Sequence, residues 1–582
     1  MAEYYIIDGG IQVGPYSAGD LKKMLHNKML TPETSVQISG GPQNGKYVSL
    51  QEIIAENSAP ASGNTATLLS FENNILRIAC PACGQHYKLT AEDRDTDEYT
   101  CVKCSANFRL PPKPAAPRTE NWNDSETEIP EGDLLCPHCW KSFDRDYVLY
   151  ISVHPSLFGD PVLGEYVPKR FVPTVFNQAG QPLDQCGLPA TEMACPRCHL
   201  HIPAGLLDAP ALYFSIAGAT SSGKSYFLTC LTHQLRKTLP EFFGAAFFDA
   251  DPRLSDTLNT YEKQLFMPLE PENITALPAT QIAGAGISDR VRLDNIEIEL
   301  PKPFVFEFRN KDESGNLNMI FYDNSGEMFI PGRDEWMNQA TCHLSHSDGI
   351  VFLFDPTNDA SMRLKLCDRR DPQVSRNPRV VDQTVLLNEM ISRIRRHANM
   401  LSAENCQIPL VIAVGKYDTW KEHFSEDISR LPLTVLPDSE ENEYALDMDK
   451  LHSVSFALRE LMLEYAPGLV NAAESFFDKV LFIPVSNFGT LAEQDTDGII
   501  GVVPGKISPC WVEVPLLIQL AENHQLPAFY SNADAEPLGK IVRNRIVFTH
   551  PETGKNVRLP ESYANAVLQI NGKTYRLPEK EI

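Results

Sequence analysis

Gly218-Ala-Thr-Ser-Ser-Gly223-Lys224-Ser225 is the stretch that decides the fold of this chain of 582 residues. It fits the pattern Gly-x-x-x-x-Gly-Lys-Ser, in which backbone N–H groups of a glycine-containing turn and the N-terminus of the next helix surround phosphate oxygens. The apolar run 212–217 predicts a strand before it, and 226–237 predicts a helix after it. We expect phosphate and Mg²⁺ contacts from Gly218, Ser222, Gly223, Lys224, Ser225 and Tyr226, with Lys224 on the β- and γ-phosphates and Ser225 on Mg²⁺.

From residue 208 onward, apolar strand patterns alternate with helical patterns. This alternation is typical of an α/β fold with a mostly parallel sheet and helices on both faces. Further buried strands are expected at 318–322, 349–354, 409–414 and 480–484, and helices near 382–402, 449–465 and 514–524. The sequence therefore predicts a multidomain protein whose P-loop NTPase domain covers 208–527.

Later motifs follow these strands in the order that a nucleotide-binding domain needs. Asp323-Asn-Ser-Gly326 fits Asp-x-x-Gly, in which Asp323 holds Mg²⁺ through water and the Gly326 amide senses the γ-phosphate. Gly415-Lys416-Tyr417-Asp418 comes directly after the strand 409–414, and Val485-Ser486-Asn487-Phe488 after the strand 480–484.

The run Lys416-Tyr-Asp418 resembles the Asn/Thr-Lys-x-Asp motif of translation-factor-class GTPases. The resemblance implies that the Asp418 carboxylate accepts guanine N1–H and N2–H, that Lys416 lies against the base, and that Ser486 and Asn487 occupy the loop contacting guanine O6. Gly415 departs from the family pattern because it has no side chain, so weaker guanine affinity is expected. GTP or GDP with Mg²⁺ are the expected ligands, and a P-loop ATPase with a coincidental Lys-x-Asp run is the alternative.

One residue expected to act in hydrolysis also departs from the usual GTPase pattern. Glu327 stands where many relatives place Gln, and a carboxylate near the γ-phosphate adds repulsion, so slow turnover is expected. For the first-switch threonine, Thr280 is slightly preferred to Thr275. The predicted catalytic set is therefore Lys224, Asp323, Gly326, Glu327 and Thr280. A stabilising arginine is expected from Arg333, Arg370 or a partner.

Eight of the 14 cysteines form four Cys-x-x-Cys pairs, which in a long chain favours metal ligation over disulfides. The pairs Cys80/Cys83 and Cys101/Cys104 lie 17 residues apart, and Cys136/Cys139 and Cys195/Cys198 lie 55 residues apart. Four thiolates fill a tetrahedral Zn²⁺ shell and leave no position for water, so two structural zinc sites are expected. Alternative ligands for the second site are His138, Cys186, His199 and His201.

Residues 1–56 are predicted to form a small α+β unit. Gly14-Pro15-Tyr16, a helix expected after Ser17 and the run Leu30–Val36 resemble the bacterial variant of the GYF domain, an adaptor that binds proline-rich peptides. The other predicted segments are a linker at 57–75, a zinc ribbon at 76–110, a proline-rich and acidic linker at 111–131, a second zinc ribbon with an insertion at 132–207, and a C-terminal β-hairpin segment at 528–582.

Over roughly 132–527 the motif order resembles bacterial double-GTPases, a family often found beside conflict or defence genes. The resemblance implies a GTP-binding switch that acts on protein partners through GYF-like and zinc-ribbon modules. A net charge of -25 gives no electrostatic preference for nucleic acids. No apolar run reaches the roughly 18 residues of a membrane span, and the N-terminus lacks a secretory signal, so a cytoplasmic location is expected. A zinc-containing scaffold with a structural nucleotide is a further alternative.

Overall fold

The computed structural model describes the chain most fully from residue 134 onward. In the N-terminal part it describes residues 3–8, 11–16, 34–39, 47–49, 67–72, 75–79, 83, 86–89, 98–100 and 107–109. Beyond these it describes 132 and 134–579, apart from 279–287, 294–295, 311–315, 324–338, 376–379, 402, 438–442, 532–534, 544 and 571–572. The chain divides into two compact units, Met1–Trp122 and Asn123–Ile582.

The first unit consists, in its described residues, of antiparallel strands. A four-stranded sheet has the order β2-β1-β3-β4, with β1 Glu3–Asp8, β2 Ile11–Tyr16, β3 Ser35–Ser39 and β4 Tyr47–Ser49. The other strands are β5 Thr67–Glu72, β6 Ile75–Ala79, β7 His86–Leu89, β8 Glu98–Thr100 and β9 Asn107–Arg109. The linker expected at 57–75 is shorter than predicted, because its apolar end Thr67–Glu72 pairs with β6. The helix expected after Ser17 lies outside the described residues.

The second unit is built on a seven-stranded mixed sheet with the order β19-β22-β23-β18-β24-β25-β28. Neighbours from β23 to β28 run parallel, whereas β22 is antiparallel to both β23 and β19. The strands are β18 Ala211–Gly218, β19 Ala246–Asp249, β22 Phe304–Arg309, β23 Leu317–Asp323, β24 Gly349–Phe354, β25 Leu410–Val414 and β28 Val480–Pro484. The expected α/β architecture is present, with a mixed sheet in place of a mostly parallel one.

The central strand β18 is where the strand order reverses. The chain leaves β18 for β19, β22 and β23 on one side and then crosses to β24, β25 and β28 on the other. In open α/β sheets, ligands bind beyond the carboxyl ends of the strands at such a reversal. The stretch from Gly218 to Ser225 begins there.

Different helices cover the two faces of the sheet. One face packs against α3 Lys224–Phe243 and α12 Val514–Glu522. On the other face, α8 Gln383–His397 and α11 Pro467–Phe476 cover β24, β25 and β28. The helix α10 Met448–Tyr465 lies along β28 and contributes to both cores.

A cysteine module, residues 134–207, covers the remaining half of that second face. Its four cysteines and Trp140 form one buried cluster with Tyr213 of β18, Val305 of β22 and Ile320 of β23. The ribbon predicted at 132–207 therefore shares a core with the sheet predicted over 208–527, and both lie within the unit Asn123–Ile582.

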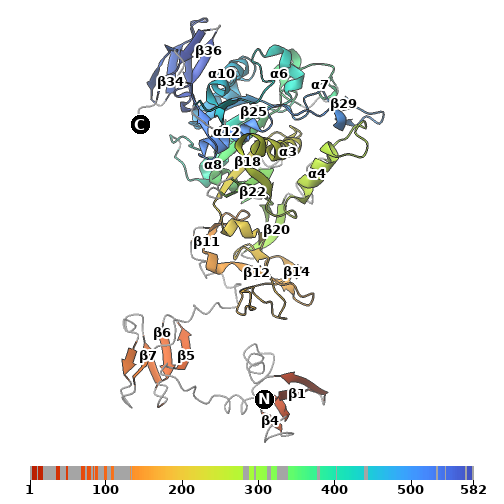
Figure 1. Ribbon diagram of the computed structural model, residues 1–582, viewed down its shortest axis with the longest axis vertical. Helices are drawn as coiled ribbons and strands as arrows, with labels where there is room; N and C mark the ends of the chain where they lie inside the picture. The colour runs from red at the N-terminus through yellow and green to blue at the C-terminus, as the bar shows by residue number, and fades with distance from the viewer. Residues whose placement is uncertain are drawn as a thin grey trace. The chain divides into compact units, whose positions relative to one another are not determined.

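The C-terminal segment forms two three-stranded sheets, β32-β37-β36 and β33-β34-β35, which pack on α10 (Figure 1). Their strands are β32 Glu536–Pro537, β33 Lys540–Val542, β34 Arg545–Thr549, β35 Asn556–Leu559, β36 Val567–Ile570 and β37 Lys573–Arg576. The segment covers the outer edge of β28: the Ser562 hydroxyl accepts the Val480 N–H at 3.2 Å and donates to the Val480 carbonyl at 2.8 Å. Covering an edge strand in this way blocks pairing with other chains.

Shorter elements complete the second unit. In the cysteine module they are β10 Leu134–Leu135, β11 Ser142–Phe143, β12 Leu149–Ile151, β13 Phe158–Asp160, β14 Gly164–Pro168, β15 Arg170–Phe171, β16 Met193–Ala194 and β17 His201–Ile202. Around the sheet they are α4 Asp256–Phe266, β20 Ser288–Leu293, β21 Ile296–Pro301, η5 Gln339–His346, α6 Ala360–Lys365, α7 Pro372–Ser375, α9 Tyr417–Trp420, β26 Leu433–Val435, β27 Tyr444–Asp447, β29 Glu493–Gln494, β30 Ile500–Gly501 and β31 Ala528–Phe529. None of the helices in the described ranges is long and apolar enough to cross a membrane.

Candidate functional site

The loop from Gly218 to Ser225 joins the end of β18 to the start of α3. A Cβ atom on Gly218 would lie 2.5 Å from the Leu353 carbonyl oxygen, so this position needs glycine. Gly223, with φ 88°, precedes the helix in the left-handed region. No side chain among the described residues caps α3, which leaves its first N–H groups pointing out at the carboxyl edge of the sheet, where an anion is favoured.

The buried side chain of Lys224 folds back over this loop. Its ammonium donates to the carbonyls of Gly218 at 3.1 Å and Ala219 at 2.7 Å. Burial lowers the pKa of Lys224 to about 8, although the carboxyl groups of Asp323 and Asp355 oppose the shift. The ammonium thus lies at the loop 218–225, here called the phosphate loop after its sequence pattern, with two carboxylates nearby.

Ser225 and Asp323 meet from opposite elements. The Ser225 hydroxyl, on the first turn of α3, donates to Asp323 Oδ2 at 2.8 Å, and Asp323 is the last residue of β23. Burial raises the pKa of Asp323. The pair presents a hydroxyl and a carboxylate oxygen, which are donors of the kind that Mg²⁺ prefers.

Asp355, directly after β24, is a site residue that the sequence interpretation missed. Its carboxylate is fully buried and accepts the Lys416 ammonium at 2.7 Å, the Thr357 hydroxyl at 2.7 Å and the Asn358 amide at 2.9 Å. The Gln383 side chain pairs with the backbone N–H and carbonyl of Asp355. The sequence feature that could have identified Asp355 is its place as an acidic residue immediately after a fully apolar strand.

The loop after β28 connects the predicted base contacts with the phosphate loop. The Ser486 hydroxyl donates to Asp418 Oδ1 and accepts the Gly489 N–H at 2.8 Å. The side-chain amide of Asn487 donates to the Gly223 carbonyl at 3.4 Å. Burial raises the pKa of Asp418 to about 6, and the hydrogen bond from Ser486 opposes that shift.

Gly415 makes its hydrogen bonds through its own backbone. Its N–H donates to the Phe354 carbonyl at 2.8 Å, and its carbonyl accepts the Trp420 indole N–H at 2.9 Å. The side-chain link between the base loops and the phosphate loop is made by Asn487 instead. A pocket of about 520 Å³ lies beside Asp418 and is lined by residues that include Cys367, Thr419, Lys421, Thr490 and Arg370.

Other predicted residues either lie outside the described residues or have different contacts. Thr280, Gly326, Glu327 and Arg333 lie outside the described residues. Thr275, the alternative switch threonine, pairs through its backbone with Val502. Arg370 forms an exposed ion pair with Asp368.

Tyr226 contacts loops rather than the phosphate-binding turn. Its hydroxyl accepts the Leu277 N–H at 2.6 Å, and its ring lies edge-on to Phe488 at 5.1 Å. It therefore joins α3 to the loop after β28.

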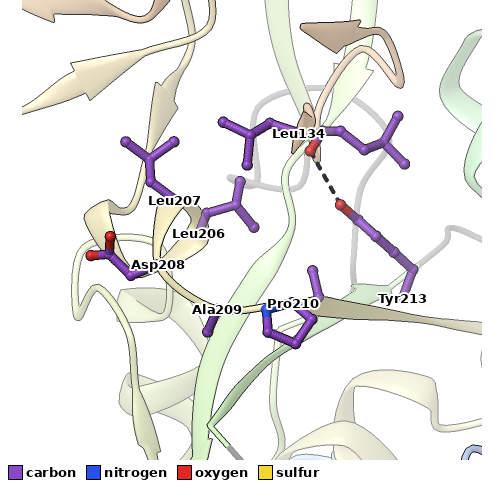
Figure 2. A pocket seen from close by; sticks show the side chains of 9 residues that line it. Leu134, Leu206, Leu207, Asp208, Ala209, Pro210 and Tyr213 are labelled. Atoms are coloured by element: carbon purple, nitrogen blue, oxygen red, sulfur yellow. Dashed lines mark hydrogen bonds between the residues drawn. The ribbon is translucent and has the colours of Figure 1, made fainter. Parts of the chain in front are cut away.

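A second pocket, of about 380 Å³, lies at the amino end of β18, away from the carboxyl edge. Figure 2 shows Leu206, Leu207 and Pro210 around it, and the hydrogen bond from the Tyr213 hydroxyl to the Leu135 carbonyl at 3.1 Å. Its lining is mainly aliphatic, and it holds none of the residues predicted for nucleotide binding.

Cys136, Cys139, Cys195 and Cys198 form a buried cluster that could hold a metal ion, with all four sulfur atoms within 4.8 Å of one another. The Sγ atoms of Cys136 and Cys198 are 3.7 Å apart, and those of Cys139 and Cys195 are 3.8 Å apart. A tetrahedron with Zn–S bonds of about 2.3 Å has S···S separations of about 3.8 Å. The donor set and its size therefore fit zinc.

The two cysteine pairs have matching backbones. In each loop the second residue after the first cysteine donates its N–H to that cysteine's sulfur at 3.4 Å: His138 to Cys136 and Arg197 to Cys195. Trp140 and His199, each following the second cysteine, both have left-handed backbones. Two such turns facing one another form the four-sulfur cluster.

The alternative ligands have other partners. His138 Nε2 contacts the His201 carbonyl, His199 pairs with Asp160, His201 lies 3.5 Å from Asp251, and Cys186 lies on the surface near Ser156. Of the first predicted zinc site, Cys80, Cys101 and Cys104 lie outside the described residues and Cys83 is described. One of the two expected four-cysteine sites is therefore seen as a cluster in the described part of the chain.

The sheet and the phosphate loop together are consistent with an α/β NTPase-like fold. No family model matches the chain. A protein of Mycolicibacterium smegmatis provisionally described as the ESX-1 scaffolding and assembly protein SaeC is 27% identical over 200 residues, which are 34% of this chain and 47% of that protein. The match thus spans about half the length of that relative.

One solved structure similar to this chain is a Plasmodium falciparum protein provisionally described as nucleolar GTP-binding protein 1. It is 13% identical, with a TM-score of 0.21, and the match covers 55% of this chain and 89% of that one. A structural similarity with so low a TM-score supports no conclusion about function.

Proposed function

We propose that this chain binds guanine nucleotides with Mg²⁺ and acts as a slowly hydrolysing GTP switch. The observation that carries the proposal is the loop after β28. Ser486 bonds to Asp418, and the next residue, Asn487, bonds to Gly223 of the phosphate loop. Residues assigned to the base and to the phosphates thus belong to one connected site at the carboxyl edge of the sheet.

The residues of the site suit the separate parts of a nucleotide. The loop amides and Lys224 bind the β- and γ-phosphates, while Ser225 and Asp323 hold Mg²⁺, Asp323 through water. Asp418 accepts the two N–H donors of guanine, and Lys416 lies against the base, oriented by Asp355. Gly326, Glu327 and Thr280 keep their proposed roles in sensing the γ-phosphate and in hydrolysis.

We further propose that the cluster of Cys136, Cys139, Cys195 and Cys198 holds zinc. Zinc there supplies a cross-link between two chain segments, since four thiolates complete its shell. The proposed second site uses Cys80, Cys83, Cys101 and Cys104.

We also propose a cellular role. A scaffold or assembly role is the second candidate, favoured by the name of the mycobacterial relative. Protein partners bound through the GYF-like unit, a conflict or defence setting and a cytoplasmic location belong to this proposal, and a P-loop ATPase is the alternative chemistry.

The decisive test is base selectivity. Asparagine at position 418 would offer one acceptor and one donor, which suits xanthine, whose O2 replaces the guanine amino group. We expect Asp418→Asn to weaken GDP binding by about 10- to 100-fold and to strengthen XDP binding, measured by equilibrium titration of the full chain with Mg²⁺.

A matched control is Asp427→Asn, which changes an exposed carboxylate on the same segment between β25 and β26. It should leave both affinities unchanged. Tighter binding of ATP than of GTP by the unaltered chain would reject the guanine assignment.

A further inference from the structure

The last two residues of β23 point to opposite faces of the sheet, as neighbours in a strand do. Asp323 faces α3 and accepts the Ser225 hydroxyl at 2.8 Å. Tyr322 faces the cysteine module, and its hydroxyl donates to the Pro137 carbonyl at 2.7 Å. Pro137 lies between Cys136 and Cys139, so one strand end contacts both the proposed Mg²⁺ site and the cysteine centre.

The Tyr322 ring is held on both sides. Trp140, the residue after Cys139, lies edge-on to it at 4.7 Å, and His343 stacks on it at 4.8 Å. His343 Nδ1 is 2.5 Å from the hydroxyl of Ser215, which pairs with Tyr322 across β18 and β23. All four side chains are buried, so Tyr322 has little freedom to move independently of the cysteine module.

A second connection reaches the same module from β20 and β21. Val291 and Leu300 lie in the core cluster that contains the four cysteines, and the Arg292 N–H donates to the Val162 carbonyl at 2.9 Å. The cysteine module thus packs against β20 and β21, which precede β22 in the sequence, and against β23, which follows it.

We propose that metal in the cysteine centre and Mg²⁺–nucleotide at the phosphate loop strengthen each other's binding, and that Tyr322 is the positioning residue that couples them. The inference rests on the proposed nucleotide function. Metal ligation fixes the turn that carries Pro137, the hydrogen bond from Tyr322 fixes the end of β23, and Asp323 is thereby held opposite Ser225. Coupling between two sites is reciprocal, with typical factors of about 5 to 150.

The experiment uses the full zinc-loaded chain. Zinc transfer to the chromophoric chelator 4-(2-pyridylazo)resorcinol is timed with and without saturating Mg·GDP, and Mg·GDP affinity is titrated before and after zinc removal. We expect Mg·GDP to slow zinc transfer, and zinc removal to weaken Mg·GDP binding, each by at least about fivefold. Tyr322→Phe keeps the ring but deletes the hydroxyl, and should bring both factors close to one while zinc still binds at full stoichiometry.

Tyr213→Phe is the matched control. Its hydroxyl also donates to the cysteine module, at the Leu135 carbonyl (Figure 2). Tyr213, however, lies on β18 opposite Ile320, two residues before Tyr322 in β23. A merely structural contribution of a buried hydroxyl would affect both variants alike, whereas positioning predicts that Tyr213→Phe keeps the coupling.

The outcomes separate the two proposals. Coupling that survives Tyr322→Phe, or zinc transfer that neither Mg·GDP nor Mg·ATP changes in an unaltered chain that binds nucleotide, would overturn the inference while the nucleotide function stands. The same coupling with Mg·ATP but not Mg·GDP would overturn only the base assignment. A chain that binds no nucleotide would overturn both. The zinc-transfer arm needs no zinc-free protein, so unfolding after zinc removal does not remove the test.

Discussion

Asp418 lies buried at the carboxyl edge of the sheet, where Ser486 donates to it. Burial raises its pKa from the ordinary 3.8 to about 6, so the folded protein takes up a proton there as the pH falls through about 6. The protonated group cannot accept both guanine donors. This shift stabilises the fold at acidic pH, and that contribution is lost as the pH rises from 3.8 to about 6.

We therefore expect GDP affinity to be highest near pH 7, below the pKa of Lys224 at about 8, and to fall by about tenfold per pH unit well below pH 6. Calorimetric titrations between pH 8 and pH 5 would measure this. Asp418→Asn, which has no carboxyl group to titrate, should give a profile without this step. A flat profile for the unaltered chain would contradict the assignment of Asp418 to the base.

Lys416 and Asp355 form an ion pair in which the carboxylate is fully buried and the lysine side chain is 16% exposed. Lys416→Met leaves the carboxylate without its counter-charge, and we expect it to lower the free energy of unfolding by about 3 kcal/mol. Adding Asp355→Asn should recover part of that loss, because the buried group is then neutral. Chemical denaturation of the four proteins of this cycle measures the coupling, and strictly additive losses would mean that the pair contributes little.

At the residue scale, the motifs predicted a site of Lys224, Ser225, Asp323, Lys416 and Asp418, and the structure brings these residues to one edge of the sheet. Motif spacing is informative because it fixes where a residue lies relative to a strand end. Asp355 could not be predicted in this way, because its partner Lys416 lies 61 residues away and the two meet only through the order of β24 and β25. Asn487 was predicted in the loop that contacts guanine O6, but its contact with Gly223, which spans 264 residues, could not be predicted.

The outer edge of β28 depends on hydroxyl groups. The Ser455 hydroxyl on α10 accepts the Phe482 N–H at 2.8 Å and lies 2.5 Å from the Tyr563 hydroxyl of the C-terminal segment. Ser455→Ala leaves a buried backbone N–H without its acceptor, so we expect a loss of about 1 to 3 kcal/mol in the free energy of unfolding. Urea denaturation would measure it.

Ser453→Ala is the control on the same helix. Its hydroxyl makes one bond, to the Val567 carbonyl at 3.1 Å, and is only partly buried. We expect its loss to cost about 1 kcal/mol or less. Equal losses for the two variants would show that covering the β28 edge adds nothing to stability.

The elements that the sequence predicted well are the buried strands of the sheet. β18, β23, β24, β25 and β28 each lie within a residue or so of the expected apolar runs, because strands buried on both faces are continuously apolar. The place of the cysteine module was not predictable, since the apolar side chains of Trp140 and Leu206 carry no information about which surface covers them. Its position on the sheet follows from tertiary packing.

At the scale of the whole molecule, the described parts of both candidate sites lie within the unit Asn123–Ile582. We expect a chain of residues 123–582 to bind Mg·GDP within about twofold of the full chain and to keep the metal of the second cysteine cluster, because that unit has its own core. Equilibrium titration and metal analysis would check both. Lys224→Ala in this shorter chain is the control and should abolish tight binding.

The covered edge of β28 has a consequence for the order in which the protein is synthesised. A ribosome completes the strands and loops of the proposed nucleotide site once Asn487 has emerged, but Ser562 and Tyr563, which cover the edge, follow more than 70 residues later. During that interval the nascent sheet has an unpaired, strongly apolar border, of the kind that seeds association between incomplete chains. Chaperone demand on this protein should therefore be greatest late in translation, when all residues of the proposed nucleotide site have already been synthesised.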